Sequence, residues 1–259
     1  MAIIASTAIE SRGLFVFDKD QPMDHVRALS DRYNAARPFP HIVFDDFLDD
    51  AFAESIRRDF PPEDACSVLR LNTNAYLKRG YRPDDLGSNP CRQHVHQFNT
   101  GPFLQFLEAL TGIRGLIPDP YFAGGGLHET ERGGRLGVHA DFNLYAPLNL
   151  VRRINVLVYL NREWRPQYGG HLELWDATMS RCVTAIEPVF NRCVIFNTDK
   201  ASFHGQPEPL NCPEGMTRRS IAAYYYTAPT AALVATAELN ELTDYKARPG
   251  TADASVPER

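Results

Sequence analysis

Gly137-Val138-His139-Ala140-Asp141-Phe142-Asn143 is the stretch around which this sequence is organised. One residue separates a histidine from a carboxylate in it, and two such residues on a β-strand point to the same face. His204, far downstream, adds a second histidine. Two histidines and one carboxylate leave half of the octahedral positions of a metal ion open, which suits Fe(II) that binds a co-substrate and O₂. The pattern predicts a facial metal triad of His139, Asp141 and His204.

Around this stretch, short strand-like runs alternate with Gly, Pro and Asn turns. Many short strands with few helical periods favour a jelly roll over a doubly wound fold. We therefore expect a mainly β protein with supporting helices, of the α+β class. The expected strands are residues 121–130, 135–142, 152–161, 171–175, 182–187, 191–197, 202–206 and 218–227.

The N-terminal part has mixed character, and we expect it to support the strands. Apolar spacing of three to four predicts helices over 22–36, between the segment 45–48 and Pro61, and over 101–111, the last ended by Gly112. Short apolar runs predict strands at 13–17 and 41–44. Turn signals predict an irregular, partly mobile region at 63–100. We expect one domain over residues 1–259: support and a possible lid in 1–120, the strand core in 121–227, and a C-terminal helix to about Tyr245 with a frayed tail in 228–259.

Two of the expected strands carry polar side chains that period-two alternation turns inward. Asn155, Leu157 and Tyr159 share one face of their strand, and the apolar opposite face predicts a covering layer of helices. In the strand at 218–227, either Arg218 or Arg219 faces inward. A buried guanidinium needs an anion, and its planar fork fits a carboxylate. A phenol and an arginine inside the barrel therefore predict a site for a dicarboxylate.

Composition limits the remaining possibilities. The chain has 259 residues, a formal net charge of −5 and no basic run, which argues against nucleic-acid and anionic-membrane partners. It has no apolar stretch of about 18 residues or more, and its start lacks the features of a signal peptide. Five cysteines without a CxxC motif favour reduced thiols. We expect a cytoplasmic protein with a small-molecule substrate.

Further motifs follow one another along the expected strands. They are His139-Ala140-Asp141, Tyr159-Leu160-Asn161 followed by Trp164, Gly169-Gly170-His171-Leu172-Glu173-Leu174, Ile186-Glu187-Pro188, Val194-Ile195-Phe196-Asn197, His204, and the strand from Arg218 to Tyr224. In this order they make residues 121–227 resemble the Fe(II)/2-oxoglutarate-dependent dioxygenases of the prolyl 4-hydroxylase-like family. The segment 38–48 resembles the entry segment of that family. The resemblance implies a double-stranded β-helix with N-terminal helices packed on one sheet.

The resemblance also implies roles for individual residues. His139, Asp141 and His204 match the iron ligands. Arg218 matches the residue that binds the C5 carboxylate of 2-oxoglutarate, although a long segment after His204 leaves the choice between Arg218 and Arg219 open. The other matching positions around the co-substrate are Tyr159, His128, Leu172 and Ser220.

The implied reaction uses Fe(II), 2-oxoglutarate and O₂, with ascorbate as a reductant. It yields succinate and CO₂ and hydroxylates an unactivated C–H bond of a small molecule or an amino-acid-type substrate. The carboxylate of Asp141 predicts hydroxylation, because related halogenases have a small residue there. Two alternatives stay open: a peptidyl-prolyl 4-hydroxylase that acts on a protein, and a cupin-like metal-binding barrel.

Several further cations and amides lie near strand ends or in the region 63–100. They are Asn143, Arg152, Arg153 and Arg219, together with Arg70, Asn72 and Lys78. Because long polar side chains at such positions are mostly solvated, we interpret them as surface residues rather than as substrate contacts.

Overall fold

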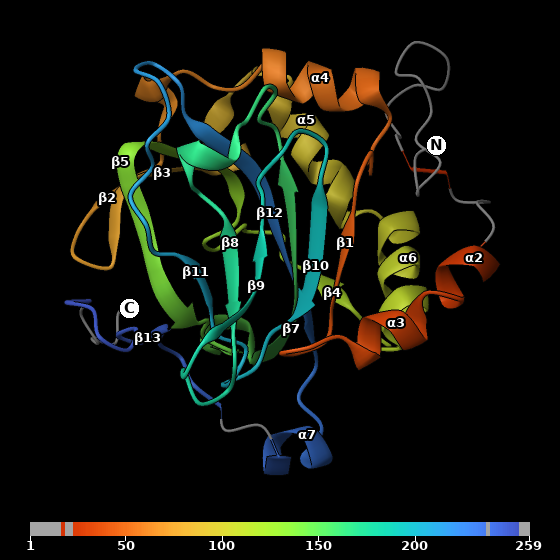
Figure 1. Ribbon diagram of the computed structural model, residues 1–259. Helices are drawn as coiled ribbons and strands as arrows, with labels where there is room; N and C mark the ends of the chain where they lie inside the picture. Colours follow the sequence, from red (N-terminus) through yellow and green to blue (C-terminus); the bar gives the residue numbers. More distant parts are fainter. Residues whose placement is uncertain (1–16, 19–22, 237–238, 254–259) are drawn as a thin grey trace.

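The computed structural model describes residues 17–18, 23–236 and 239–253, and its centre is a curled antiparallel sheet (Figure 1). The strands are β1 (His41–Phe44), β2 (Val68–Leu71), β3 (Ala75–Tyr81), β4 (Ile117–Pro118), β5 (Gly126–Ala140), β6 (Leu144–Tyr145), β7 (Leu150–Tyr159), β8 (Leu172–Trp175), β9 (Cys182–Ile186), β10 (Cys193–Asn197), β11 (His204–Gln206), β12 (Arg218–Thr227) and β13 (Asp244–Tyr245). The main path of hydrogen-bonded neighbours is β1-β10-β7-β12-β5-β11-β8-β9. The sheet curls along this path, as the predicted jelly roll requires.

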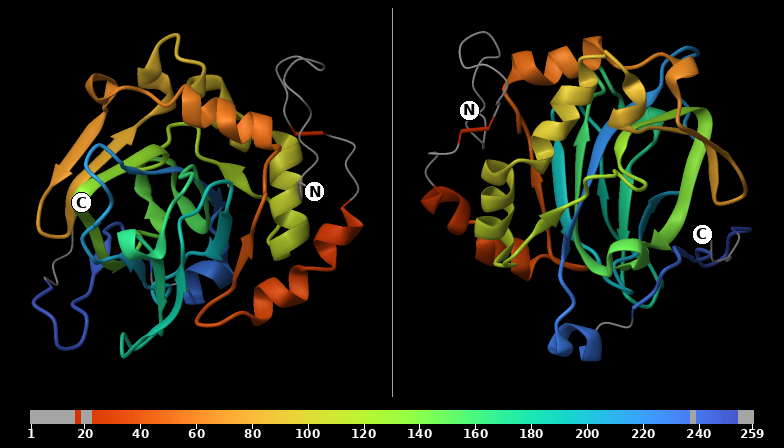
Figure 2. Two further views of the ribbon diagram at one scale, coloured as in Figure 1. Left: turned by 45° about the horizontal axis from the view of Figure 1, so that its top comes forward. Right: turned by 180° about the vertical axis from the view of Figure 1, so that it is seen from behind.

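Helices cover one face of this sheet. The helices in the described part of the chain are α2 (Asp24–Arg27), α3 (Ser30–Ala35), α4 (Asp50–Arg58), α5 (Cys91–His96), α6 (Gly101–Thr111) and α7 (Ala231–Thr236), with 3₁₀ turns at Glu63–Ala65, Pro83–Leu86, Gln97–Asn99, Ala146–Leu148 and Pro166–Tyr168. Of these, α7 lies apart from the covering layer, below the sheet in Figure 1. Figure 2 shows α3, α4, α5 and α6 gathered on one side of the strands. Their buried aromatic side chains form a single core with the outward side chains Ile154, Val156 and Val158 of β7. The predicted covering layer of helices is confirmed.

A second, smaller core lies inside the curl. Leu174 and Ile186 of β8 and β9 pack there with Phe196 of β10. Tyr159 belongs to this inner core, and Leu157 is packed against it, so the predicted inward face of β7 is correct. The mainly β, jelly-roll class is thereby confirmed, with one apolar layer under the helices and another between the two halves of the sheet.

Strand β5 connects the two halves of the sheet. Its first part, up to Thr130, pairs with β12, and its second part pairs with β11 at Leu136 and His139. At the bend lies Gly134, where an added Cβ would approach the Tyr76 carbonyl oxygen to 2.9 Å. We expected two strands, at 121–130 and 135–142. They are one strand because β3 pairs with β5 on both sides of the bend.

The region 63–100 was predicted to be irregular, but it contains regular secondary structure. It contains the hairpin of β2 and β3, and β3 is hydrogen-bonded to β5. Weak local periodicity concealed this arrangement, because the strand that holds β3 in place lies far along the chain. The hairpin is therefore part of the sheet.

Two predicted helices are shorter than expected. The helix predicted over 22–36 is divided into α2 and α3, where the Leu29 amide donates to the Val26 carbonyl instead of continuing the α-helical pattern. The helix predicted up to about Tyr245 ends at Thr236, and β13 pairs with β5 beside His139. By contrast, α6 ends at Gly112 as predicted, with a left-handed φ of 75°.

Other predicted segments fall at the limits of the description. Of the strand predicted at 13–17, residues 13–16 lie outside the described residues, as do 254–259 of the tail. In the part of the chain that the structure describes, no helix is long and apolar enough to span a membrane.

Candidate metal centre and co-substrate pocket

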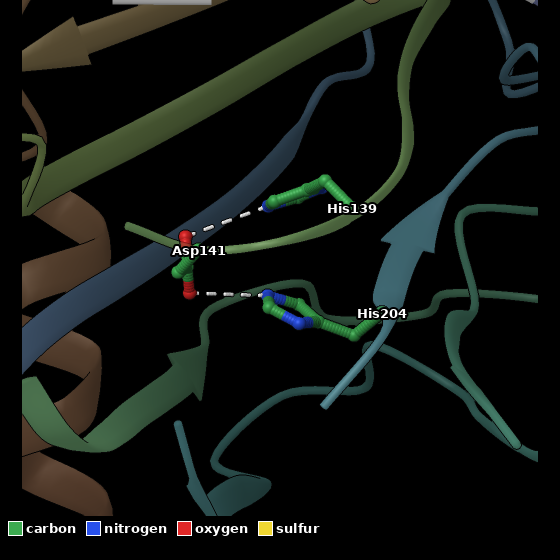
Figure 3. A group of neighbouring side chains, drawn as sticks. All are labelled: His139, Asp141 and His204. Atoms are coloured by element: carbon green, nitrogen blue, oxygen red, sulfur yellow. Dashed lines mark ion pairs between the residues drawn. The ribbon is translucent and has the colours of Figure 1, made fainter. Parts of the chain in front are cut away.

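The predicted triad comes together inside the curl. His139 and His204 lie opposite each other on the paired strands β5 and β11, and Asp141 follows β5 directly. The Asp141 carboxylate lies 3.6 Å from His139 Nε2 and 3.5 Å from His204 Nε2 (Figure 3). One ligand atom from each residue lies within 4.8 Å of the other two, so the three side chains could hold one metal ion.

Hydrogen bonds fix which nitrogen of each imidazole faces the centre. His139 Nδ1 lies 2.8 Å from the Gly137 carbonyl oxygen, and His204 Nδ1 lies 2.9 Å from that of Ser202. Each Nδ1–H donates to its carbonyl, which leaves the Nε2 lone pair free toward the carboxylate. Burial and the adjacent His139 also lower the pKa of His204 to about 4, so its imidazole is neutral near pH 7. Neutral imidazole is the form that binds a metal.

The Asp141 carboxylate is held by two polar neighbours. Asn155 Nδ2 donates to Asp141 Oδ2 at 2.7 Å, and Arg152 Nη2 lies 3.1 Å from the same oxygen. Burial alone would raise the pKa of Asp141, but Arg152 and the two histidines outweigh it and hold that pKa well below its ordinary value. The carboxylate is therefore ionised and oriented before any metal binds.

Arg152 is not a surface residue, contrary to the prediction. Its side chain is 1% exposed, and its guanidinium lies 3.5 Å from the ring centroid of Tyr224. A bulge explains the error. Ile154 pairs with Tyr225, whereas Arg152 pairs with Tyr226, so Arg153 is an extra residue in β7. An extra residue reverses the alternation, and it places Arg152 on the inner side with Asn155.

Arg218 is the inward arginine of β12. It is buried, its Nε donates to the Gly170 carbonyl at 2.7 Å, and its Nη2 lies 3.3 Å from the Tyr159 hydroxyl. Arg219 points to the other side and pairs with the buried Glu129 at 2.9 Å. Among the described residues, no carboxylate lies within ion-pair distance of Arg218. A buried guanidinium without a counter-charge fits an anionic guest.

These groups surround one cavity of about 440 Å³. The triad and Arg218 line it together with all but one of the other predicted co-substrate residues. The exception is Tyr159, which does not line the cavity itself. Its hydroxyl contacts Nη2 of Arg218, which does line the cavity. His128 donates from Nε2 to the Gly124 carbonyl at 3.0 Å, and burial followed by nearby Lys78 holds its pKa well below the ordinary value. The predicted lining residues are His128, Leu172 and Ser220.

Other residues of the cavity were not predicted as site residues. The ring of Tyr245 in β13 packs at a tilt against the His139 ring, with centroids 5.0 Å apart. The β2–β3 hairpin contributes Arg70 and Lys78, which were predicted to be surface residues. Alternation along two paired strands would have predicted that Arg70 and Lys78 share one face. That prediction requires knowing that the region 63–100 contains strands.

Part of the chain matches a known protein family. Residues 125–226 match the family model described as the 2OG-Fe(II) oxygenase superfamily, and that segment contains all three triad residues. No curated protein sequence matches the chain.

Solved structures of prolyl hydroxylases share the fold. A prolyl-4-hydroxylase from Pseudomonas putida has a TM-score of 0.53 and 19% identity, covering 80% of this chain and 100% of that one. A prolyl hydroxylase from Trichoplax adhaerens, in complex with a hypoxia inducible factor peptide fragment, has a TM-score of 0.57 and 15% identity, with 81% and 95% covered. Prolyl 4-hydroxylases from Phytophthora capsici have a TM-score of 0.54 and 14% identity, with 88% and 76% covered.

At these identities the solved structures show a common fold, and the family match and the donor set show the chemistry. Two histidines and a carboxylate with open positions suit Fe(II), and the unpaired Arg218 beside them suits a dicarboxylate. The chain is therefore a 2-oxoglutarate-dependent dioxygenase that uses Fe(II), and residues 125–226 carry the domain of the 2OG-Fe(II) oxygenase superfamily.

Proposed function

We propose that the protein hydroxylates an unactivated C–H bond of a small molecule or amino-acid-type substrate and converts 2-oxoglutarate to succinate and CO₂. The observation that carries this proposal is the joining of the metal triad and the unpaired Arg218 in one cavity. Iron, 2-oxoglutarate and O₂ would supply the oxidising chemistry, with one oxygen atom of O₂ entering the substrate and the other entering succinate, and the protein positions the C–H bond and excludes water.

In this proposal His139, Asp141 and His204 hold the iron. Arg218 holds the C5 carboxylate of 2-oxoglutarate, and Tyr159 positions the guanidinium through its hydroxyl and its ring. Leu172 and Ser220 shape the wall, and the neutral His128 is placed to meet the other end of the co-substrate. Because Asp141 is present and ionised, it occupies the metal position that a halide would need, which favours hydroxylation over halogenation.

The alternatives make different demands on the site. A cupin-like barrel would not require the buried Arg218 with its Tyr159 support. A peptidyl-prolyl 4-hydroxylase would require room for a chain, and a cavity of about 440 Å³ that also has to hold 2-oxoglutarate favours a small substrate.

The test is formation of succinate from 2-oxoglutarate by the purified protein with Fe(II) and O₂. We expect turnover by the wild type, stimulation by the true substrate and a product heavier by one oxygen atom. Asp141→Ala removes a metal ligand and should abolish turnover, whereas Arg181→Gln removes an exposed cation outside the cavity and should not. Undiminished turnover by Asp141→Ala would exclude this site. Hydroxylation of a proline-containing peptide but of no small molecule would favour the protein substrate.

A further inference from the structure

Two cations of the β2–β3 hairpin face the cavity side by side. Arg70 and Lys78 are directly paired across the hairpin, and both line the cavity. Neither has a carboxylate within ion-pair distance among the described residues. Like charges directly opposite each other on paired strands repel, and partial burial strengthens the repulsion. Such a pair is favourable when an anion lies between its members.

Among the described residues, no carboxylate of the cavity wall forms an ion pair with Arg70 or Lys78. The cationic lining residues are Arg70, Lys78, Arg152 and Arg218, and the carboxylates are Asp141 and Glu241. Fe(II) and the 2-oxoglutarate dianion cancel each other when both bind, so loading the site leaves the positive surplus in place. Arg152 already neutralises Asp141, and Arg218 is already proposed to hold 2-oxoglutarate. The positive surplus is therefore at Arg70 and Lys78. Glu241 also lines the cavity, but it is exposed and forms no ion pair with either cation in the described part of the chain.

The wall that follows Asp141 has the opposite character. Phe142, Leu144 and Pro147 line the cavity with carbon, and Tyr145 lies beside them against Tyr226, with ring centroids 5.8 Å apart. A guest that reaches from the hairpin to this wall meets cations at one end and apolar surface at the other. Lys78 pairs with Thr130 in the first part of β5, whereas the apolar wall follows the end of β5, where His139 and Asp141 lie, so a guest that spans the two passes the triad.

We infer that the substrate is a small amphipathic anion, whose carboxylate or phosphate group binds between Arg70 and Lys78 and whose apolar part packs against Phe142 and Leu144. This inference rests on the proposed function and names its substrate class. The C–H bond to be oxidised lies in the part of the molecule between these two ends. A neutral substrate would leave the two cations unpaired in the loaded enzyme.

The ionisation of Lys78 agrees with this arrangement. Burial, followed by the cations Arg70 and Arg218, lowers the pKa of Lys78 to about 7. An anion bound beside it would stabilise the ammonium and raise that pKa again.

The test measures binding, so that it does not depend on turnover. The protein is loaded with Mn(II), which replaces Fe(II) without supporting oxidation, and with 2-oxoglutarate. Matched pairs of probes are then titrated by calorimetry: amino-acid-sized carboxylic acids with their carboxamides, and sugar phosphates with the parent sugars. We expect the acids or the phosphates to bind, and the dissociation constants of their neutral partners to be at least about tenfold higher. Which series binds decides between carboxylate and phosphate.

Variants of the hairpin decide where the anion lies. Lys78→Gln and Arg70→Gln should each weaken binding of the preferred anion about tenfold, with a much smaller effect on the affinity for 2-oxoglutarate. Arg181→Gln is the matched control and should leave anion binding as it is. Equal binding of acids and neutral partners, or no binding by either series, would overturn the inference. A loss of 2-oxoglutarate affinity as large as the loss of anion affinity would assign both cations to the co-substrate instead.

The proposed function and this inference can fail separately. Absence of succinate formation by the Fe(II)-loaded wild type contradicts the proposed function, whatever the probes do. A wild type that forms succinate but binds neutral partners as well as acids contradicts only the substrate class.

Discussion

The two consecutive arginines of β12 have different surroundings and should respond differently to substitution. Arg218→Gln removes the cation that faces the cavity, and it should raise the KM for 2-oxoglutarate roughly 30-fold or more, because hydrogen bonds to charged groups contribute about 1.5–3 kcal/mol each. Arg219→Gln removes the partner of Glu129 instead and should lower thermal stability with little change in that KM. Steady-state kinetics of both variants with varied 2-oxoglutarate make the comparison, and equal KM values would contradict it.

Arg152 is a positioning residue, since it touches the ligand Asp141 rather than the reacting atoms. Arg152→Met removes the ion pair and the contacts with Asn155, so the carboxylate loses its fixed orientation. We expect Mn(II) affinity to fall about 10- to 100-fold, as for other groups that orient metal ligands. Arg152→Lys keeps the charge and should recover part of that affinity. If both variants have the melting temperature of the wild type and also bind Mn(II) with the affinity of the wild type, this role is excluded.

Lys78 gives the site a pH dependence with a defined sign. A lysine with a pKa of about 7 is charged below that pH and neutral above it, so binding of an anion should weaken as pH rises from about 7 to 9. The other charged or titratable groups facing it are Arg70, Arg218, Asp141 and His128. The pKa values of Asp141 and His128 are both held well below their ordinary values, so neither group changes charge in this range. Calorimetric titration of the preferred anion over this range tests the sign, and Lys78→Gln should flatten the profile.

At the scale of the elements, Gly205 decides how closely β11 approaches β5. An added Cβ there would lie 2.8 Å from the Gly137 carbonyl oxygen, so Gly205→Ala must push the two strands apart next to His139 and His204. We expect a loss of about 2 kcal/mol in unfolding free energy and weaker metal binding. Gly101→Ala, at the start of α6 with open space around it, should be neutral or stabilising by up to about 1 kcal/mol. Chemical denaturation of both variants makes the comparison.

Local pattern predicted those elements whose stabilising contacts are local or periodic. The strand at 218–227, the strand at 41–44 and the helix at 101–111 have the bounds that alternation and the stop at Gly112 indicated. The alternation of β7 also turned Tyr159 inward, and the spacing of His139 and Asp141 placed both at one site. These signals need only the neighbouring residues in the sequence.

Features that depend on distant partners could not be predicted in this way. The bulge at Arg153 depends on the register between β7 and β12, and without it Arg152 is assigned to the wrong face. The β2–β3 hairpin depends on β5 for its place in the sheet, so Arg70 and Lys78 were interpreted as solvated. A helix was expected to extend to about Tyr245. The structure has strand β13 at Tyr245 instead, because this segment pairs with the distant strand β5 beside His139.

For the whole molecule, metal and co-substrate should act as stabilisers, because the residues that bind them converge only in the folded chain. Mn(II) and 2-oxoglutarate at about 100 times their dissociation constants should add about 2.7 kcal/mol or more, which for a chain of this length raises the melting temperature by roughly 5–10 °C. Asp141→Ala should lose most of this rise. Differential scanning calorimetry with and without the two ligands tests the prediction, and an equal rise in Asp141→Ala would contradict it.

The place of β12 in the sheet has a consequence for biosynthesis. β12 lies between β7 and β5 and hydrogen-bonds to both, yet it follows them by a long interval in the chain. A ribosome therefore releases β5, with His139, well before the strand that joins β5 to β7 exists. Sheets built on such distant pairings fold slowly and expose unpaired edges meanwhile. We expect nascent chains that stop before Arg218 to be protease-sensitive and dependent on chaperones, with the barrel closing only after β12 has left the ribosome.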